Sequence, residues 1–276
     1  MKPGGQGAGG SADFRAQLLR AWGDILAGWR RRQLWGTIGL DHVRQKYRRS
    51  VLGPFWITIS MGVMVSALGL LYGKIFKQNL QEYLPYIASG FVVWGLISNL
   101  VLDGTRTFIV AEPMIRQITA PISVYVYRSL WSNLITFAHN IWIYVVVALW
   151  FGVFPGWEVL WVLPALVLLL VNGLWVGLLF GLIGVRFRDF PLIVNSVVQV
   201  MFFITPIIWR PQMLPGRALI LEYNPFYHFV EILRDPLLGA VPSWDHWVAV
   251  LLITLMGWLL TLAAYARYRW RIPYWA

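Results

Sequence analysis

The chain has 276 residues, of which 58% are hydrophobic and only 13% are charged, with a formal net charge of +11. Soluble domains carry about 25% charged residues, so this composition argues against a soluble globular protein and indicates a lipid-facing one. Ten of the 23 Lys and Arg residues precede Pro54 and most others flank apolar runs, which is a membrane-protein pattern and not that of a nucleic-acid binder. Cysteine is absent, which excludes disulfides and thiolate metal sites.

Residues 1–12 are Gly-rich and are expected to form a disordered tail with no cleavable signal peptide. Residues 13–53 are expected to be a cytoplasmic interface segment. From Phe14 to Trp29 apolar residues recur at helical spacing beside several arginines, which predicts an amphipathic helix lying among membrane lipids. Packing of this helix on a partner subunit fits the pattern equally well. A basic stretch then leads to the first apolar run and contains Arg44, Lys46, Arg48 and Arg49.

Residues 54–276 are expected to form a transmembrane domain of six spans. The apolar runs cover about 55–72, 86–102, 130–151, 159–185, 192–209 and 247–265. Each has roughly the 17–25 residues that cross about 30 Å of hydrocarbon as a helix. The predicted fold class is therefore an all-α integral membrane protein with an interfacial N-terminal helix.

The distribution of basic residues predicts the orientation of these spans. If the N-terminus is cytoplasmic, 18 of the 23 Lys and Arg residues lie on the cytoplasmic side. Such an excess is a strong positive-inside signal. We therefore expect both termini in the cytoplasm, with residues 210–246 forming a loop on the outer side.

Few ionisable residues fall inside the apolar runs, so the machinery of a proton-coupled transporter is missing. His139 beside Asn140 is the main exception, and a satisfied interhelical hydrogen bond is the expected reason for it. The sequence has no GxxxxGK motif followed by Ser or Thr. We expect no ATP, metal or other cofactor in this chain, so ATP and Mg²⁺ would bind to a separate subunit.

The outer loop predicts a short helix that begins at Asn224, an N-cap, with Pro225 in its first turn and Gly239 at its end. Its apolar face would include Phe226, with Arg234 elsewhere. Such a helix would either re-enter a protein-lined cavity or lie on the surface. The loop also holds Glu222, Glu231, Asp235 and Asp245, which we interpret as solvated loop charges and helix pairs. A membrane glycosyl or acyl transferase, with a catalytic base here, is the alternative.

The inner loop at residues 103–128 predicts a second short helix, opened by Pro113 and stopped before Pro121. It comprises Met114, Ile115, Arg116, Gln117 and Ile118. One side is apolar and would dock against lipid headgroups or a cytoplasmic subunit.

Aromatic residues make up 16% of the chain. Their faces would suit a sliding glycan, although most are expected to pack or to anchor the spans at the interface.

Three segments together resemble permeases of O-antigen-type polysaccharide ABC exporters. They are Leu52-Gly53-Pro54-Phe55-Trp56, Arg186-Phe187-Arg188-Asp189, and the stretch from Asn224-Pro225 to Arg234-Asp235-Pro236-Leu237-Leu238-Gly239. They occur in the family's order, each on the expected side of the membrane. The resemblance extends from about residue 14 to the C-terminus.

The resemblance implies a homodimeric permease in the cytoplasmic membrane that works with two copies of a nucleotide-binding ATPase and exports a lipid-linked glycan. The helix at Met114–Ile118 would be the coupling helix, and the Asn224–Gly239 element would supply the re-entrant helices. The first and fifth spans would line a channel, with Phe55, Trp56, Phe202 and Phe203 as candidate aromatics. Independently of the resemblance, the basic residues 44–49 would either attract a pyrophosphate-bearing lipid carrier or serve only to orient the chain and anchor it to anionic lipid. The first span lacks a proline that many relatives carry, which makes a teichoic-acid or small-molecule exporter a less favoured alternative.

Overall fold

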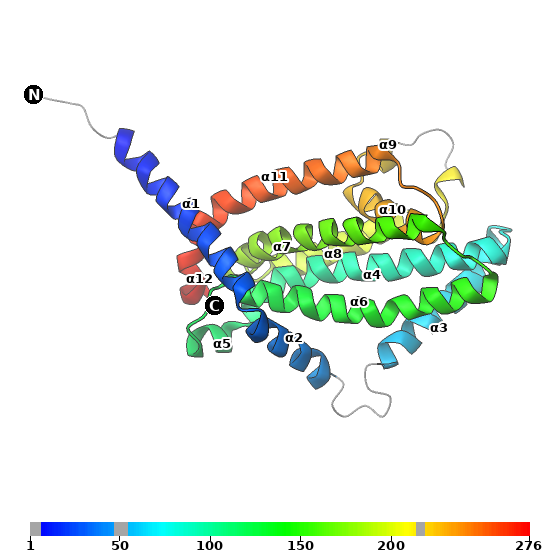
Figure 1. Cartoon of the computed structure of the whole chain (residues 1–276), viewed down its shortest axis with the longest axis horizontal. Helices are drawn as coiled ribbons and strands as arrows, with labels where there is room; N and C mark the ends of the chain where they lie inside the picture. Colours follow the sequence, from blue (N-terminus) through cyan, green and yellow to red (C-terminus); the bar gives the residue numbers. More distant parts are fainter. Residues whose placement is uncertain (1–6, 47–54, 214–218) are drawn as a thin grey trace, which may run out of the picture.

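The structure, a computed structural model, describes residues 7–46, 55–213 and 219–276, and these residues form helices and connecting turns without a β-strand (Figure 1). Two N-terminal helices are α1 (Gly7–Arg30) and α2 (Arg32–Lys46). The long helices are α3 (Phe55–Ile75), α4 (Leu80–Val110), α6 (Ser123–Phe151), α7 (Val162–Arg186) and α11 (Trp244–Tyr268). Shorter helices are α5 (Glu112–Gln117), α8 (Phe190–Ile204), α9 (Leu219–Glu222), α10 (Pro225–Leu237) and α12 (Ile272–Trp275), and three 3₁₀ turns are η1 (Trp157–Trp161), η2 (Pro211–Met213) and η3 (Arg269–Arg271).

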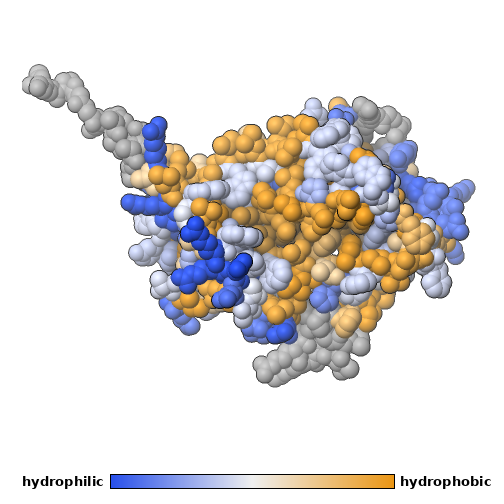
Figure 2. Space-filling view, in the orientation of Figure 1, coloured by the Kyte–Doolittle hydropathy of each residue, from blue (hydrophilic) through white to orange (hydrophobic). Residues whose placement is uncertain are grey.

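The long helices run roughly alongside one another, so the bundle has two ends (Figure 1). The α5 end carries α5, α12 and the junction of α1 with α2, and the α10 end carries α9 and α10. Figure 2 shows a largely hydrophobic surface between the ends, with hydrophilic residues gathered mostly toward them. This distribution is that of a protein embedded in a bilayer.

Five segments are long and apolar enough to span a membrane, and α8 is a shorter sixth apolar helix. The all-α prediction is confirmed, and six spans is approximately right. The predicted fifth span was too long, because residues 192–209 are helical only as far as Ile204. Thr205 is extended, at φ −80° and ψ 134°, as expected for a residue that precedes a proline.

The N-terminal segment differs from the predicted tail and single helix. Helix α1 begins at Gly7, so half of the predicted tail is helical, consistent with a helix extending more easily than it nucleates. A second helix, α2, was not predicted. It packs on α6, where a Cβ built on Gly39 would lie 2.9 Å from the Trp131 side chain.

Asp24 ties α1 to the rest of the bundle. Its carboxylate accepts hydrogen bonds from the backbone N–H groups of Ile122 (3.1 Å) and Ser123 (3.0 Å) and from the Tyr265 hydroxyl (2.8 Å). It therefore stabilises the start of α6, where unpaired N–H groups and the helix dipole favour a negative charge. These bonds join α1, α6 and α11 at the α5 end.

Helix α7 packs against α4 and α6 through a row of glycines at Gly173, Gly177, Gly181 and Gly184. Small residues four apart let membrane helices approach closely. Gly181 illustrates the fit, since a Cβ there would lie 3.2 Å from the backbone oxygen of Gly104. The closest approach is at Gly184, where a Cβ would lie only 2.0 Å from the backbone oxygen of Thr105.

We expect Gly184→Ala to destabilise the protein strongly, because backbone atoms of α4 would have to move. Overpacking a tight interior typically costs about 1–3 kcal/mol, and displacing a helix backbone should reach the upper part of that range. Gly62→Ala on α3 is the matched control, since its added Cβ meets nothing within 4 Å. The melting temperatures of the purified proteins in detergent test this, and equal values for both variants would contradict the packing described.

Candidate functional site

Helix α5 is where the inner-loop prediction placed it, with Pro113 in its first turn and Ile118 as the C-cap. Met114 and Ile115 pack against the buried cluster at this end of the bundle, which holds the helix in place. Arg116, Gln117 and Ile118 are exposed. The helix thus offers a polar outer side on a rigid base.

The C-terminus of the chain lies beside α5. Arg116 pairs with Glu112 (2.9 Å) and donates to the backbone oxygen of Ala276 (2.9 Å). Arg188, in the turn after α7, donates to the Trp275 oxygen at 3.4 Å. Three segments far apart in the sequence, α5, residues 186–189 and α12, therefore form one surface, which we call the docking surface.

The basic stretch predicted for substrate access is only partly described. Arg44, on α2, is exposed and lies 3.9 Å from the Asp41 carboxylate. Lys46 is the last residue of α2 and its side chain is outside the described set, as are Arg48 and Arg49 entirely. The structure therefore describes one of these four side chains, in the last turns of α2.

Helices α3 and α8, like α11, leave most of their residues uncovered. Only Val65, Gly69 and Gly73 of α3 and Pro191, Val194 and Val198 of α8 are buried. The predicted channel aromatics on them are largely uncovered, with Phe55 66%, Trp56 53% and Phe203 70% exposed. Open faces of this kind are available for a second subunit, a substrate or lipid.

A cavity of about 480 Å³ lies between α4 and α8. Its lining combines aromatic and polar side chains, namely Trp94, Ser98, Asn195, Gln199, Phe202 and Phe203. Trp94 connects the predicted channel aromatics with the predicted outer helix. Its ring centroid lies 5.7 Å from that of Phe202 and 5.4 Å from that of Phe226 on α10. Phe55 and Trp56 do not line this cavity.

The Asn224–Gly239 prediction is confirmed as α10. The Asn224 side chain accepts from the backbone N–H of Phe226 at 3.0 Å, Pro225 is in the first turn, and Gly239 has a left-handed φ of +82°. The helix was expected to be half-buried, yet most of its residues are buried. Burial on nearly every side fits a helix inserted among the others, not one lying on a surface.

The chain between α8 and η2 is held by side chains from α4 and α10. Tyr83 donates to the backbone oxygen of Ile208. Tyr86 donates to the backbone oxygens of Pro206 (2.9 Å) and Trp209 (3.0 Å), and Arg234 donates to that of Pro206 (2.6 Å). We call residues 205–210 the unwound segment. Side chains replace the helical partners that its carbonyl groups lack.

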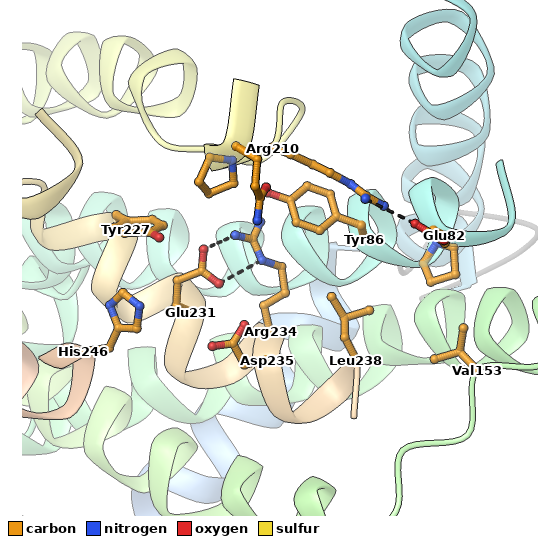
Figure 3. Close-up of a pocket in the computed structure, with 13 residues that line it drawn as sticks. Glu82, Tyr86, Val153, Arg210, Tyr227, Glu231, Arg234, Asp235, Leu238 and His246 are labelled. Atoms are coloured by element: carbon orange, nitrogen blue, oxygen red, sulfur yellow. Dashed lines mark hydrogen bonds and ion pairs between the residues drawn. The ribbon is translucent and has the colours of Figure 1, made fainter. Parts of the chain in front are cut away.

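Arg234 is the centre of this network (Figure 3). Its side chain is 1% exposed, forms an ion pair with Glu231, and lies with its guanidinium carbon 4.2 Å from the centroid of the Tyr86 ring. The interpretation of the loop acids was right for Glu231 in that it forms a helix pair, but Glu231 is not solvated, because it is 6% exposed. Spacing of three residues on a helix looks like a surface pair in sequence, and only the packing of α10 reveals the burial.

A polar cavity of about 470 Å³ opens beside this network and is lined by Tyr86, Arg210, Tyr227, Asp235 and His246 among others (Figure 3). Burial, and then the neighbouring Glu231 carboxyl, raises the pKa of Asp235 to about 8. His228 and His246 share a hydrogen bond of 2.8 Å.

The expectation for His139 was wrong in detail. Its ring nitrogen Nδ1 lies 2.8 Å from the Ile135 backbone oxygen, within the same helix. The interhelical bond at this position comes instead from the Thr58 hydroxyl, which donates to the backbone oxygen of His139 at 3.2 Å. The Asn140 side-chain oxygen is buried without a partner.

Among the described residues, no group of three or more His, Asp or Glu side chains is arranged to hold a metal ion.

Apolar helices with small helices at both ends define a multi-pass α-helical membrane protein. Comparison with protein families narrows this class. The chain belongs to the ABC-2 type transporter family, whose profile matches residues 33–238. It is therefore a permease subunit, the membrane component of an ABC transporter, and the family implies an ATPase partner.

The chain is also similar to curated permeases of the same kind. An O-antigen export system permease protein RfbA of Klebsiella pneumoniae is 20% identical over 226 residues, which cover 81% of this chain and 86% of that protein. The protein of the same name from Myxococcus xanthus is 25% identical over 187 residues, covering 66% of this chain and 72% of that protein. The predicted resemblance to O-antigen-type ABC exporter permeases is thus confirmed.

Proposed function

We propose that this permease subunit exports a lipid-linked polysaccharide, O-antigen-like or capsular, across the cytoplasmic membrane. The cavity between α4 and α8 carries the proposal. It sets amides (Asn195 and Gln199) beside the rings of Trp94 and Phe202 on the uncovered side of α8. Amides bond to hydroxyls and aromatic faces stack on sugar rings, so this lining, although mainly apolar, is compatible with a glycan. The RfbA relatives, named as O-antigen export permeases, support the same substrate class.

The proposed assembly is a homodimer with two copies of a separate ATPase. Two copies of this chain would meet through α3 and α8, whose open faces have no other cover among the described residues. The docking surface would contact the ATPase in the cytoplasm, with α5 as the coupling helix. Both termini are then cytoplasmic and the α10 end faces outward. The chain would need no catalytic site or cofactor of its own, since ATP and Mg²⁺ would act on the partner.

Three alternatives remain to be separated from this proposal. A teichoic-acid exporter or a small-molecule exporter would share the fold. A membrane glycosyl or acyl transferase would need an acid or base from the α10 end, and Glu231, Asp235 and His246 do line one cavity there. Its carboxylate Glu231, however, is already paired with the buried Arg234, which favours a structural role.

Depletion of the protein in its native cell tests the proposal. Lipid-linked polysaccharide should accumulate on the cytoplasmic leaflet at its full length, because synthesis continues while transport stops. Accumulation of shortened or unmodified chains would favour the transferase instead. Normal surface polysaccharide together with retention of another cargo would contradict the proposed substrate.

A further inference from the structure

A small polar cavity of about 180 Å³ lies between α2, α4 and α6 at the α5 end. Its polar lining includes His42, Asp103, Arg106, Thr107, Arg128 and Ser129. At about 30 Å³ for each water, the volume corresponds to roughly six waters. It has room for a phosphate group and is too small for a sugar chain.

Arg128 is buried beside this cavity, and one of its side-chain donors has no hydrogen-bond partner. Its residue is 6% exposed, and its Nε atom is buried with no hydrogen-bond partner. Among the described residues it takes part in no ion pair; Asp103 lines the same cavity, but its carboxylate accepts from the Asn133 side chain at 3.0 Å. The Asp103 charge offsets part of the cost of burying Arg128, and an anion in the cavity would provide a partner for the remaining donors.

The charges around the cavity favour an anion. Arg106 and Arg128 contribute two positive charges, against one negative charge from Asp103. Arginine presents a planar fork of N–H donors that matches the oxygens of a phosphate. The hydroxyl of Ser129 adds a neutral polar group. The cavity thus combines the size, charge and donors of a phosphate site.

We infer that this cavity binds the phosphate group of a lipid, held by Arg128 inside and Arg106 at its mouth. The site lies beside α2, whose last turns carry Arg44 and Lys46, within the basic stretch expected to attract a pyrophosphate-bearing carrier. We assign the phosphate to the diphosphate of that carrier, and this assignment rests on the proposed function. The phosphate site itself does not depend on it.

Binding measurements on the purified full-length protein test the inference with three probes: inorganic pyrophosphate, a polyprenyl diphosphate and phosphatidylglycerol. The polyprenyl diphosphate should bind most tightly. Arg128→Gln and Arg106→Gln should each weaken its binding by roughly tenfold or more, as expected from loss of a charge-assisted contact to phosphate. Arg20→Gln, an exposed arginine on α1, should leave binding unchanged.

A thermal measurement separates ligand binding from a structural role for Arg128. If the role of Arg128 is to bind an anion, the Arg128→Gln variant without ligand should have a melting temperature no lower than that of the wild type. Addition of the polyprenyl diphosphate should then raise the melting temperature of the wild type and not that of the variant. A lower melting temperature without ligand, or wild-type affinity in both variants, would overturn the site. Equal binding of phosphatidylglycerol would overturn the carrier assignment alone. If the wild-type protein binds the polyprenyl diphosphate but exports no polysaccharide, the proposed function is contradicted and the phosphate site is not.

Discussion

Charge reversal at Arg116 is expected to disconnect the permease from its ATPase. The Arg116 side chain is 62% exposed at the docking surface, and α5 is fixed beneath it by Met114 and Ile115. Arg116→Glu would place two acidic residues, at positions 112 and 116, one helical turn apart. It would also present a negative charge to the partner where the wild type presents a positive one. If the partner buries Arg116 in a hydrogen-bonded charge pair, its loss costs about 2–5 kcal/mol. Association should therefore weaken at least roughly tenfold, and nucleotide-driven export should fall to background.

Copurification of the tagged permease with its ATPase measures this directly. Arg15→Glu is the matched control, because it reverses an exposed charge on α1, away from the docking surface. The Arg116 variant should keep the wild-type melting temperature when purified alone, since the side chain is mostly exposed. Undiminished copurification of Arg116→Glu would show that α5 is not the contact with the ATPase.

Removal of Arg234 is expected to have the largest effect on stability. The Arg234→Ala variant would leave the Glu231 carboxylate buried without its partner and would remove one of the two hydrogen bonds to the Pro206 carbonyl in the unwound segment. Breaking a buried ion pair from one side typically costs about 3–5 kcal/mol, a large share of the stability of a typical domain. We expect a poor yield of folded protein and a markedly lower melting temperature.

Two further variants isolate the ion pair as the cause. Arg210→Ala removes a pair with Glu82, which is 68% exposed, and should cost less than about 1 kcal/mol. The double variant Glu231→Gln with Arg234→Met removes both charges and should be more stable than Arg234→Ala, because no unpaired charge remains. If the double variant is as unstable as the single one, the carbonyl contacts matter more than the ion pair.

Features set by local sequence were predictable. The apolar runs gave the spans, because helix length must match the thickness of the hydrocarbon. Asn224 and Pro225 gave the start of α10, since an N-cap and a proline in the first turn act within a few residues. Pro113 and Pro121 bounded α5 for the same reason. Span ends were predicted less well, as the early end of α8 at Ile204 illustrates.

Features set by tertiary packing were not predictable. Helix α2 has no clear apolar stripe and depends on contacts with α6, such as the bond from the Ser132 hydroxyl to the Gly39 oxygen at 3.0 Å. The contact between Asp24 and the start of α6 joins residues 98 positions apart. Arg128 lies at the end of the predicted inner loop, residues 103–128, where nothing in the sequence indicates burial. Its burial and the unpaired Nε atom appear only when α2, α4 and α6 are assembled.

Reconstitution of the purified permease in lipid vesicles tests the central claim most directly. A fluorescent lipid-linked oligosaccharide is placed on the leaflet next to the docking surface, and its appearance on the opposite leaflet is followed. We predict movement only when the ATPase and ATP are both present, and none with Arg116→Glu. Movement of the oligosaccharide, or its chemical modification, by the permease alone would contradict the view that this chain holds a pathway and depends on a partner for its energy.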